Sequence, residues 1–359
     1  MADTPGPDGR PPGRPAAATP LGRFRAEARD AITPRTGLLV LGVLILELAF
    51  AVSYIGAFHS PTPERLPVAV VAPAAERQRV VDELNGIPGE PLSARPADSA
   101  GQARTMVLER DVDAALQVSP DRGPDRLLVA SAAGPSGVQA LERVLQKADP
   151  SQPVEITDLR PPNEADGRGL ASFYLAVGLV VGGYLAAAAA AASYGARPAN
   201  PHRMLIRLGA LTVVSVLSGL GGAIVADFVF DALPGHFVAL WWIGAFTTFA
   251  AAAAGMAFQV LLGPAGVALS VLIFVVLGNP SGVYPSVLLP PFWRDLGPAL
   301  PNGASVTLLR NYAYFGGHHT ATAWWVLSAW AVGGVLVGAL AARFRRGRGR
   351  RAPEPAAPG

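Results

Sequence analysis

The residues that could do chemistry are few and scattered along the chain. The 359 residues include no cysteine, which excludes disulfides, thiolate nucleophiles and cysteine-ligated zinc. The five histidines form no His-x-x-x-His pair and have no glutamate-rich segment nearby. They are His59, His202, His236, His318 and His319. No Gly-x-x-x-x-Gly-Lys-Ser/Thr loop, which would cradle nucleotide phosphates, is present. The sequence therefore predicts no enzyme active site, no metal site and no cofactor.

One carboxylate is notable for its surroundings. Glu47 lies near the middle of a 22-residue apolar run, residues 37–58. A charged carboxylate at the centre of a bilayer is costly unless it is protonated, paired or turned toward other helices. We therefore expect Glu47 to face neighbouring helices. Two roles stay open for it: contact with a proton or substrate, or a neutral carboxyl hydrogen-bonded to another helix.

The elements that must position these residues are apolar helices. Hydrophobic residues make up 51% of the chain and charged residues only 15%, against about 25% in a typical soluble domain. One bilayer crossing needs about 20 apolar residues. Residues 237–278 contain no charge and must turn back, which Gly263-Pro264 permits. The six predicted transmembrane helices are 37–58, 170–193, 208–230, 237–262, 265–278 and 322–342.

Residues 59–169 have a different composition, with 17 acidic and 12 basic residues and a net charge of −5. Short apolar or β-branched segments alternate there with helical patterns, which predicts a small α/β domain with at least partly parallel strands. The predicted strands are 68–71, 114–118, 127–130 and 154–159, and the predicted helices are 74–84, 98–110 and 135–148. The fold class is therefore a membrane all-α bundle of six transmembrane helices with an α/β domain inserted between the first and second.

Arginine placement predicts the orientation. Six arginines precede residue 37, three lie in the connector 194–207 before the third predicted helix, and six crowd the end of the last helix. The positive-inside rule then places both termini in the cytoplasm and the α/β domain outside the plasma membrane. The arginine-rich end is interpreted as a lipid contact, and nucleic acid is not expected as a partner.

The terminal segments are predicted to be simple. Residues 1–18 and 344–359 read as disordered cytoplasmic tails because they offer too little apolar surface to fold. Residues 19–36 show apolar residues at helical spacing with arginines off that face, typical of an amphipathic helix at the membrane surface. A solvated linker is the alternative for this segment.

The layout of one span, an α/β domain and five further spans resembles the permease subunits of type-2 ATP-binding-cassette (ABC) exporters. It is most similar to the actinobacterial phage-infection-protein-like members. Within the α/β domain the likeness rests on residues 67–71 and 111–118. In the outer loop, 279–321, it rests on Leu277-Gly278-Asn279-Pro280-Ser281-Gly282, Leu289-Pro290-Pro291-Phe292-Trp293, Leu300-Pro301-Asn302-Gly303-Ala304 and Leu309-Arg310-Asn311-Tyr312-Ala313-Tyr314-Phe315. Its aromatic residues and prolines predict a re-entrant or interfacial element beside the bundle.

The resemblance implies a separate cytoplasmic ABC ATPase, a homo- or heterodimer in the lipid bilayer, and outward movement of an amphiphilic or lipid-like solute. It implies ATPase contacts at Phe24, Arg197, His202, Arg203 and Arg207. The outer-loop motif residues are Asn279, Pro280, Pro290, Pro301, Arg310, Tyr312 and Phe315. The alternative function is a non-transporting envelope protein whose external domain binds a wall component, a secreted protein or a phage. A membrane enzyme is disfavoured, because the predicted spans contain no clustered His, Asp or Glu.

Overall fold

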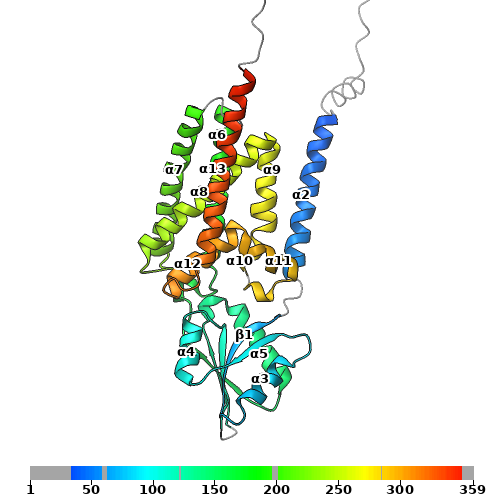
Figure 1. Cartoon of the computed structure of the whole chain (residues 1–359), viewed down its shortest axis with the longest axis vertical. Coiled ribbons are helices and arrows are strands. Elements are labelled where there is room, and N and C mark those ends of the chain that lie inside the picture. Colours follow the sequence, from blue (N-terminus) through cyan, green and yellow to red (C-terminus); the bar gives the residue numbers. More distant parts are fainter. Residues whose placement is uncertain (1–33, 59–62, 121–122, 196–200, 284, 350–359) are drawn as a thin grey trace, which may run out of the picture. The chain divides into compact units, whose positions relative to one another are not determined.

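The computed structural model describes residues 34–58, 63–120, 123–195, 201–283 and 285–349 (Figure 1). The chain falls into two compact units, Met1–Ala49 and Phe50–Gly359. The described part of the first unit is helical and is the beginning of α2 (Pro34–Phe58), which ends in the second unit. The predicted tail 1–18 and nearly all of the predicted amphipathic helix 19–36 lie outside the described residues.

The described part of the chain is mostly helical, and five of its helices are long and apolar enough to cross a membrane. These segments are Val40–Phe58, Ala171–Ser193, His202–Val229, Phe237–Leu262 and Ala321–Ala341. The sixth predicted span is a shorter apolar helix, Ala265–Leu277. At 1.5 Å per residue its length is about 20 Å, less than the roughly 30 Å of a hydrocarbon core. The predicted count of six is therefore supported for five helices.

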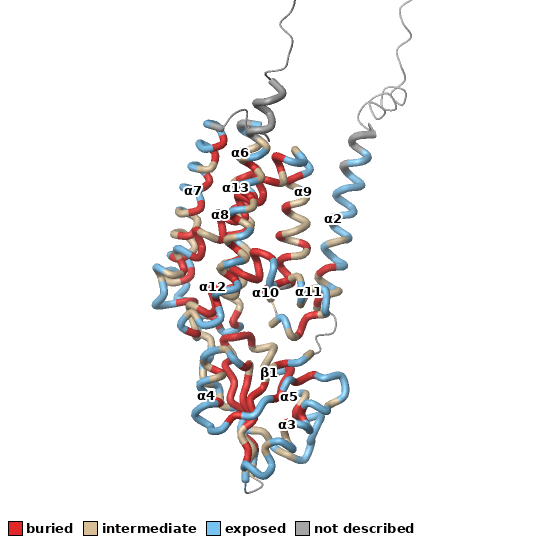
Figure 2. The backbone as a smooth tube through the Cα atoms, viewed as in Figure 1, coloured by how far each residue is buried: buried red, intermediate tan, exposed pale blue. Residues whose placement is uncertain are grey.

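Helix α8 (Phe237–Leu262) is the centre of the bundle. It contacts α6 (Ala171–Tyr194), α7 (Pro201–Ala223), α9 (Ala265–Val271) and α13 (Ala321–Gly349), which lie around it in Figure 1. In the most apolar stretch of α8, 61% of the residues are buried, against 22% in that of His202–Val229, which begins in α7. Figure 2 shows α8 largely in the colour of buried residues. An alanine run from Ala250 to Ala254 lets neighbouring helices approach closely.

Three neighbouring helices each bring one glycine against the backbone of α8. A Cβ at Gly183 of α6 would meet Thr248 and Ala251, and one at Gly334 of α13 would meet Ala253 and Ala254. On α7, a Cβ at Gly219 would meet Trp241 and Ala245, whereas one at Gly221 would meet no atom within 4 Å. Of these two glycines on α7, only Gly219 therefore serves close packing against α8.

The α/β region is one five-stranded sheet with the order β2-β1-β3-β4-β5. Its strands are β1 (Leu66–Val71), β2 (Leu92–Pro96), β3 (Ala114–Gln117), β4 (Asp125–Val129) and β5 (Val154–Asp158). The pairs β1–β2, β1–β3 and β4–β5 are parallel and β3–β4 is antiparallel, so the predicted partly parallel pairing is confirmed. Strand β2 was not predicted, because its sequence, Leu-Ser-Ala-Arg-Pro, lacks β-branched residues.

The two faces of the sheet carry separate cores because side chains alternate along each strand. Val68 and Val70 of β1 lie in one core with α3 (Arg77–Asn85) and α5 (Pro135–Ala148). Ala69, on the opposite face, lies in a second core with α4 (Ala100–Leu108). The Ser99 side chain accepts a hydrogen bond from the Gln102 amide and caps α4.

The segment after η4 (Leu272–Leu277) is largely helical. It forms the short helices α10 (Pro280–Val283) and α11 (Pro291–Leu296), then the longer α12 (Pro301–Tyr314). Pro280, Pro291 and Pro301 each stand at a helix start, where a missing N–H costs nothing. Ten of the fourteen residues of α12 are buried. The predicted re-entrant or interfacial placement of this segment stays a prediction.

Two other boundaries differ from the sequence-based predictions. Helix α7 begins at Pro201, so the last part of the predicted connector 194–207 is helical, again with a proline in the first turn. Helix α13 continues to Gly349, into the tail 344–359 that was predicted to be disordered. Residues 350–359 lie outside the described part.

Candidate functional site

The C-terminal end of α12 and the turn after it meet the α/β region. The Arg110 guanidinium lies 5.1 Å from the centre of the Phe315 ring, and His319 Nε2 lies 2.9 Å from Asp111 Oδ1. Phe315 is 3% exposed and belongs to the core beneath α4. Gly316, Gly317 and His319 have positive φ angles, which produce the tight turn that brings His319 back toward Asp111. We call the group Arg110, Asp111, Asp166, Arg310, Tyr314, Phe315 and His319 the junction.

Asp166 is the most heavily used acceptor of the junction. Its Oδ1 accepts hydrogen bonds from the backbone amides of Leu170 (2.9 Å) and Ala171 (2.8 Å), at the start of α6. Its Oδ2 accepts one from the Tyr314 hydroxyl at 3.1 Å. Negative charge at a helix N-terminus is stabilised by free amides and by the helix dipole. Asp166 therefore ties the beginning of α6 to the end of α12.

Arg310 is a buried cation in the same place, 8% exposed. Burial lowers its pKa to about 10, and Arg110 adds to this, while Asp166 and Tyr314 act in the opposite direction. Within the described residues its Nε has no hydrogen-bond partner. The pKa of Tyr314 is raised to about 12, chiefly by burial. At neutral pH Arg310 is therefore charged, and the Tyr314 hydroxyl is protonated and able to donate.

Asn279 joins a second polar contact, inside the bundle. The Asn302 amide nitrogen donates to the Phe274 carbonyl at 2.9 Å and to Asn279 Oδ1 at 2.8 Å. Asn302 is 1% exposed, and a Cβ at Gly278 would collide with it. These bonds connect α12 to the end of the short apolar helix and satisfy a carbonyl freed where that helix ends.

The remaining predicted outer-loop residues have packing roles. Pro280 and Pro301 begin α10 and α12, and Pro290 directly precedes α11. The Tyr312 ring packs edge-on against Trp324 of α13, with 6.4 Å between ring centres. Of the seven motif residues, the structure brings Arg310 and Phe315 into the junction and Asn279 to Asn302; the other four lie elsewhere along the segment.

The predicted ATPase-contact residues do not form one described site. Phe24 and Arg197 lie outside the described residues. His202 and Arg203 are exposed on the first turn of α7. Arg207 is 8% exposed, and its Nη2 donates to the carbonyls of Ala190 (3.0 Å) and Gly195 (2.6 Å). Arg207 therefore holds the end of α6 against α7, and its contact with an ATPase stays a prediction.

Glu47 lies on α2 with its side chain exposed. Glu47 belongs to the first compact unit. Its orientation toward other helices therefore stays a prediction, and so do its two possible roles. Leu44, about one turn before it, and Leu48, the next residue, are exposed as well.

The junction can fix one element against another. Sequence reasoning singled out Arg310 and Phe315 and missed Arg110, Asp111 and Asp166. One signal was available for Asp166: an acidic residue shortly before an apolar run is typical of a helix start. Arg110 and Asp111 carry no such signal, and they lie about 200 positions from their partners Phe315 and His319.

Comparison with known proteins gives one match. A family model described as ABC-2 family transporter protein matches residues 36–343. No curated protein and no solved structure matches the chain.

Proposed function

Because the chain belongs to the ABC-2 family of transporter proteins, we propose that it is the permease subunit of an ABC exporter. The family match over residues 36–343 is the observation that carries this proposal. The chain is a multi-pass membrane protein, and its described residues include five helices long enough to span a membrane. It lacks a phosphate-binding loop, so we assign ATP hydrolysis to a separate cytoplasmic ABC ATPase. The permease itself is then a transport component and not an enzyme.

The finer parts of the proposal rest on the arrangement of the chain. We infer a six-span topology with both termini in the cytoplasm, supported by the arginine distribution. The α/β region, Leu66 to Asp158 along the chain, then lies outside the cell. Its place between the first two long helices supports the phage-infection-protein-like branch. The solute is proposed to be amphiphilic or lipid-like, and the working unit a dimer.

The direct test of the transport proposal is co-purification. The tagged chain, extracted from its native membrane, should retain a protein with an ABC nucleotide-binding sequence. Recovery of the folded chain without such a partner would instead favour the alternative, a non-transporting envelope protein that binds ligands through the α/β region.

The exposed cation Arg203 offers a sharper version of this test. Arg203→Glu is expected to reduce the co-purified ATPase about tenfold, because reversing a charge at a contact weakens binding by roughly 1–2 kcal/mol. The co-purified ATPase is therefore compared at equal amounts of folded chain. Arg104→Glu, an exposed reversal on α4, is the matched control and should retain the ATPase. Equal retention by both variants would remove Arg203 from the contact.

Labelling of an introduced thiol tests the orientation. Thr105 is exposed on α4, and the chain has no cysteine, so Thr105→Cys introduces the only thiol. A membrane-impermeant maleimide is expected to label it fully in intact cells. Labelling that appears only after the cells are broken would place the α/β region in the cytoplasm.

Glu47→Gln tests the isolated carboxyl. If Glu47 is a neutral packing group, the amide preserves its size and hydrogen-bonding capacity, so protein yield and ATP hydrolysis by the co-purified complex should both be unchanged. Hydrolysis that falls while the yield stays constant would assign a functional role to the acid. Glu164→Gln, an exposed acid outside the long helices, serves as the control.

A further inference from the structure

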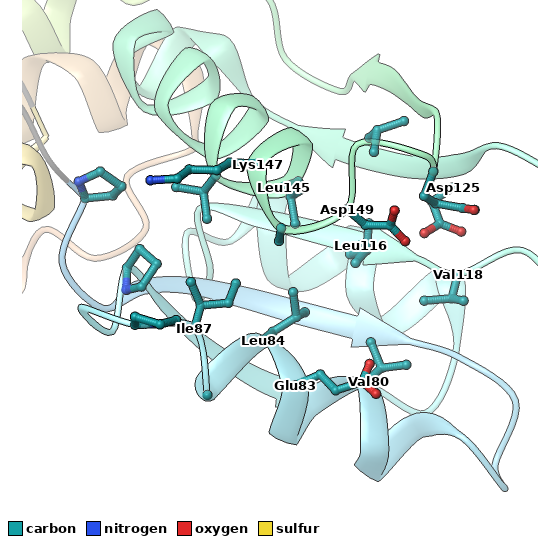
Figure 3. A pocket seen from close by; sticks show the side chains of 18 of the residues that line it. Val80, Glu83, Leu84, Ile87, Leu116, Val118, Asp125, Leu145, Lys147 and Asp149 are labelled. Atoms are coloured by element: carbon teal, nitrogen blue, oxygen red, sulfur yellow. The ribbon is translucent and has the colours of Figure 1, made fainter.

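The α/β region contains a cleft that the proposed transport function does not use. Helices α3 and α5 cover the same face of the sheet, and between them lies a cleft of about 1200 Å³ (Figure 3). Small-molecule sites usually measure about 300–1,000 Å³, so the cleft is large enough for a long ligand. It lies apart from the junction, since none of the junction residues lines it.

The walls of the cleft are aliphatic. Leu84 and Ile87 come from α3 and the turn after it, Leu116 and Val118 from β3 and its end, and Leu145 from α5 (Figure 3). Ile87 and Val118 are only half-buried, as are Val80, Val144 and Val154 on the same cleft. Aliphatic side chains gathered at an open concave surface mark a place where an apolar ligand gains from leaving water.

The charges on the cleft are unevenly distributed. Asp125 and Asp149 lie at one end, and Lys147 lies at the other (Figure 3). Two further lining carboxylates are already paired, Glu83 with Arg79 and Glu64 with Arg294. In the described chain, Asp125 and Asp149 have no ion-pair partner and accept hydrogen bonds from neighbouring backbone amides, those of Ser119 and Ser151. Hydrogen bonds from Ser151 lower the pKa of Asp149, which keeps it ionised at neutral pH.

We propose that this cleft binds a cationic amphiphile, with its apolar chain along Ile87, Leu116 and Val118 and its positive group beside Asp125 and Asp149. The aliphatic walls account for the chain and the two carboxylates for the charge. An anionic amphiphile would place its head beside these carboxylates, which repel it. A small cation without a chain would leave the aliphatic walls in water.

Because the chain contains no cysteine, an introduced cysteine is the single thiol that a maleimide can label. Ile87→Cys places a single thiol in the cleft, and Thr105→Cys places one on α4, which packs on the opposite face of the sheet. The full chain is held in phosphatidylcholine nanodiscs, and the rate of reaction with a water-soluble maleimide is measured. The probes are dodecyltrimethylammonium, dodecyl sulfate and tetramethylammonium, each below its micelle concentration.

Dodecyltrimethylammonium is expected to slow labelling at Ile87→Cys and not at Thr105→Cys. Dodecyl sulfate and tetramethylammonium should each require concentrations at least about tenfold higher. Failure of dodecyltrimethylammonium to protect Ile87→Cys, or equal protection at both thiols, would overturn the proposal. Protection by dodecyl sulfate as strong as that by the ammonium probe would overturn it too, because the site would then not select a cation.

Second substitutions separate the two parts of the site. Asp149→Asn in the Ile87→Cys chain should weaken protection about fivefold, as the loss of one exposed charge predicts. Glu142→Gln, on α5 but away from the cleft, should have no effect. Ala148→Trp adds a ring on the cleft wall and should reduce protection by the long-chain probe. Unchanged protection in both Asp149→Asn and Ala148→Trp would contradict the assigned binding mode.

This inference deepens the proposed function only if the bound amphiphile is also the exported solute. The protection assay uses the permease without an ATPase, so it tests binding alone. A chain that binds the ammonium probe but never co-purifies with an ATPase would refute the transport proposal and leave the cleft assignment standing. A chain that co-purifies with an ATPase but is not protected by the ammonium probe would refute only the assignment of the cleft as a binding site.

Discussion

Replacing Gly219 with alanine is expected to lower the free energy of unfolding by about 3 kcal/mol, whereas the same change at Gly221 should leave it unchanged or raise it by up to about 1 kcal/mol. The two glycines lie two residues apart on α7. At Gly219 the new methyl group would lie within 3.0 Å of backbone atoms of Trp241 and Ala245, and at Gly221 it would meet nothing within 4 Å.

The difference arises because the obstacle at Gly219 is the backbone of α8. A colliding side chain could change rotamer, but a helix backbone moves only by separating α7 from α8. Separation would also lengthen the hydrogen bond from Trp241 Nε1 to the Val216 carbonyl, now 3.0 Å. At Gly221 the only local effect is the better helix propensity of alanine.

Unfolding of the purified variants in mixed micelles, followed by circular dichroism, measures both changes. Gly178→Ala on α6 is a further control, because its Cβ would also meet no atom within 4 Å. Equal stability of the Gly219 and Gly221 variants would mean that α7 and α8 do not pack as closely as described.

These glycines also show how far the sequence could predict the bundle. Apolar runs predicted the five long helices of the described chain, because a helix that crosses a bilayer needs about 20 consecutive apolar residues. Glycine content alone does not say which glycines take part in close packing. That choice depends on how each helix is rotated about its axis, and an almost uniformly apolar helix gives no periodic signal for its rotation.

The α/β region was predicted nearly completely, apart from β2. The helix Pro135–Ala148 was predicted at its observed bounds, since its apolar residues recur at helical spacing after an initial proline. Strand β2 was not predicted from the sequence because it pairs with β1 at the edge of the sheet and buries only Leu92 and Ala94. Its pairing is decided by its neighbour and not by its own composition.

The junction could be predicted only in part, for a different reason. Arg310 and Phe315 were singled out through their resemblance to a family motif, but their partners Arg110 and Asp166 lie in the α/β region and just after it. A single aspartate or arginine in a polar segment has the same local appearance whether it faces water or a buried partner. Contacts between residues some 150 to 200 positions apart therefore required the structure.

Asp166→Ala is expected to lower the free energy of unfolding by about 3 kcal/mol, since hydrogen bonds to a charged group contribute roughly 1.5–3 kcal/mol each and water replaces some of them. Three bonds are lost together: two to the first amides of α6 and one to Tyr314. The variant also removes the carboxylate that most raises the pKa of Arg310 and so stabilises its buried cation. Asp166→Asn keeps an oxygen for the amides and should lose about 1 kcal/mol.

Tyr314→Phe removes the bond from α12 to Asp166 but leaves the bonds that the first amides of α6 donate to Asp166. It removes the bond to Asp166 Oδ2 and two longer bonds of 3.4 Å, one from the Asn163 amide and one to the Ala232 carbonyl. It should lose about 1–2 kcal/mol, and less in the Asp166→Ala background, because its nearest acceptor is already gone. The coupling energy from this double-mutant cycle, measured by unfolding in mixed micelles, should be about 1 kcal/mol. Glu164→Ala, an exposed acid two residues earlier, is the control and should change stability by less than about 0.5 kcal/mol. Additive losses in the double variant would mean that Tyr314 and Asp166 do not bond, and that α6 and α12 are held together by apolar packing alone.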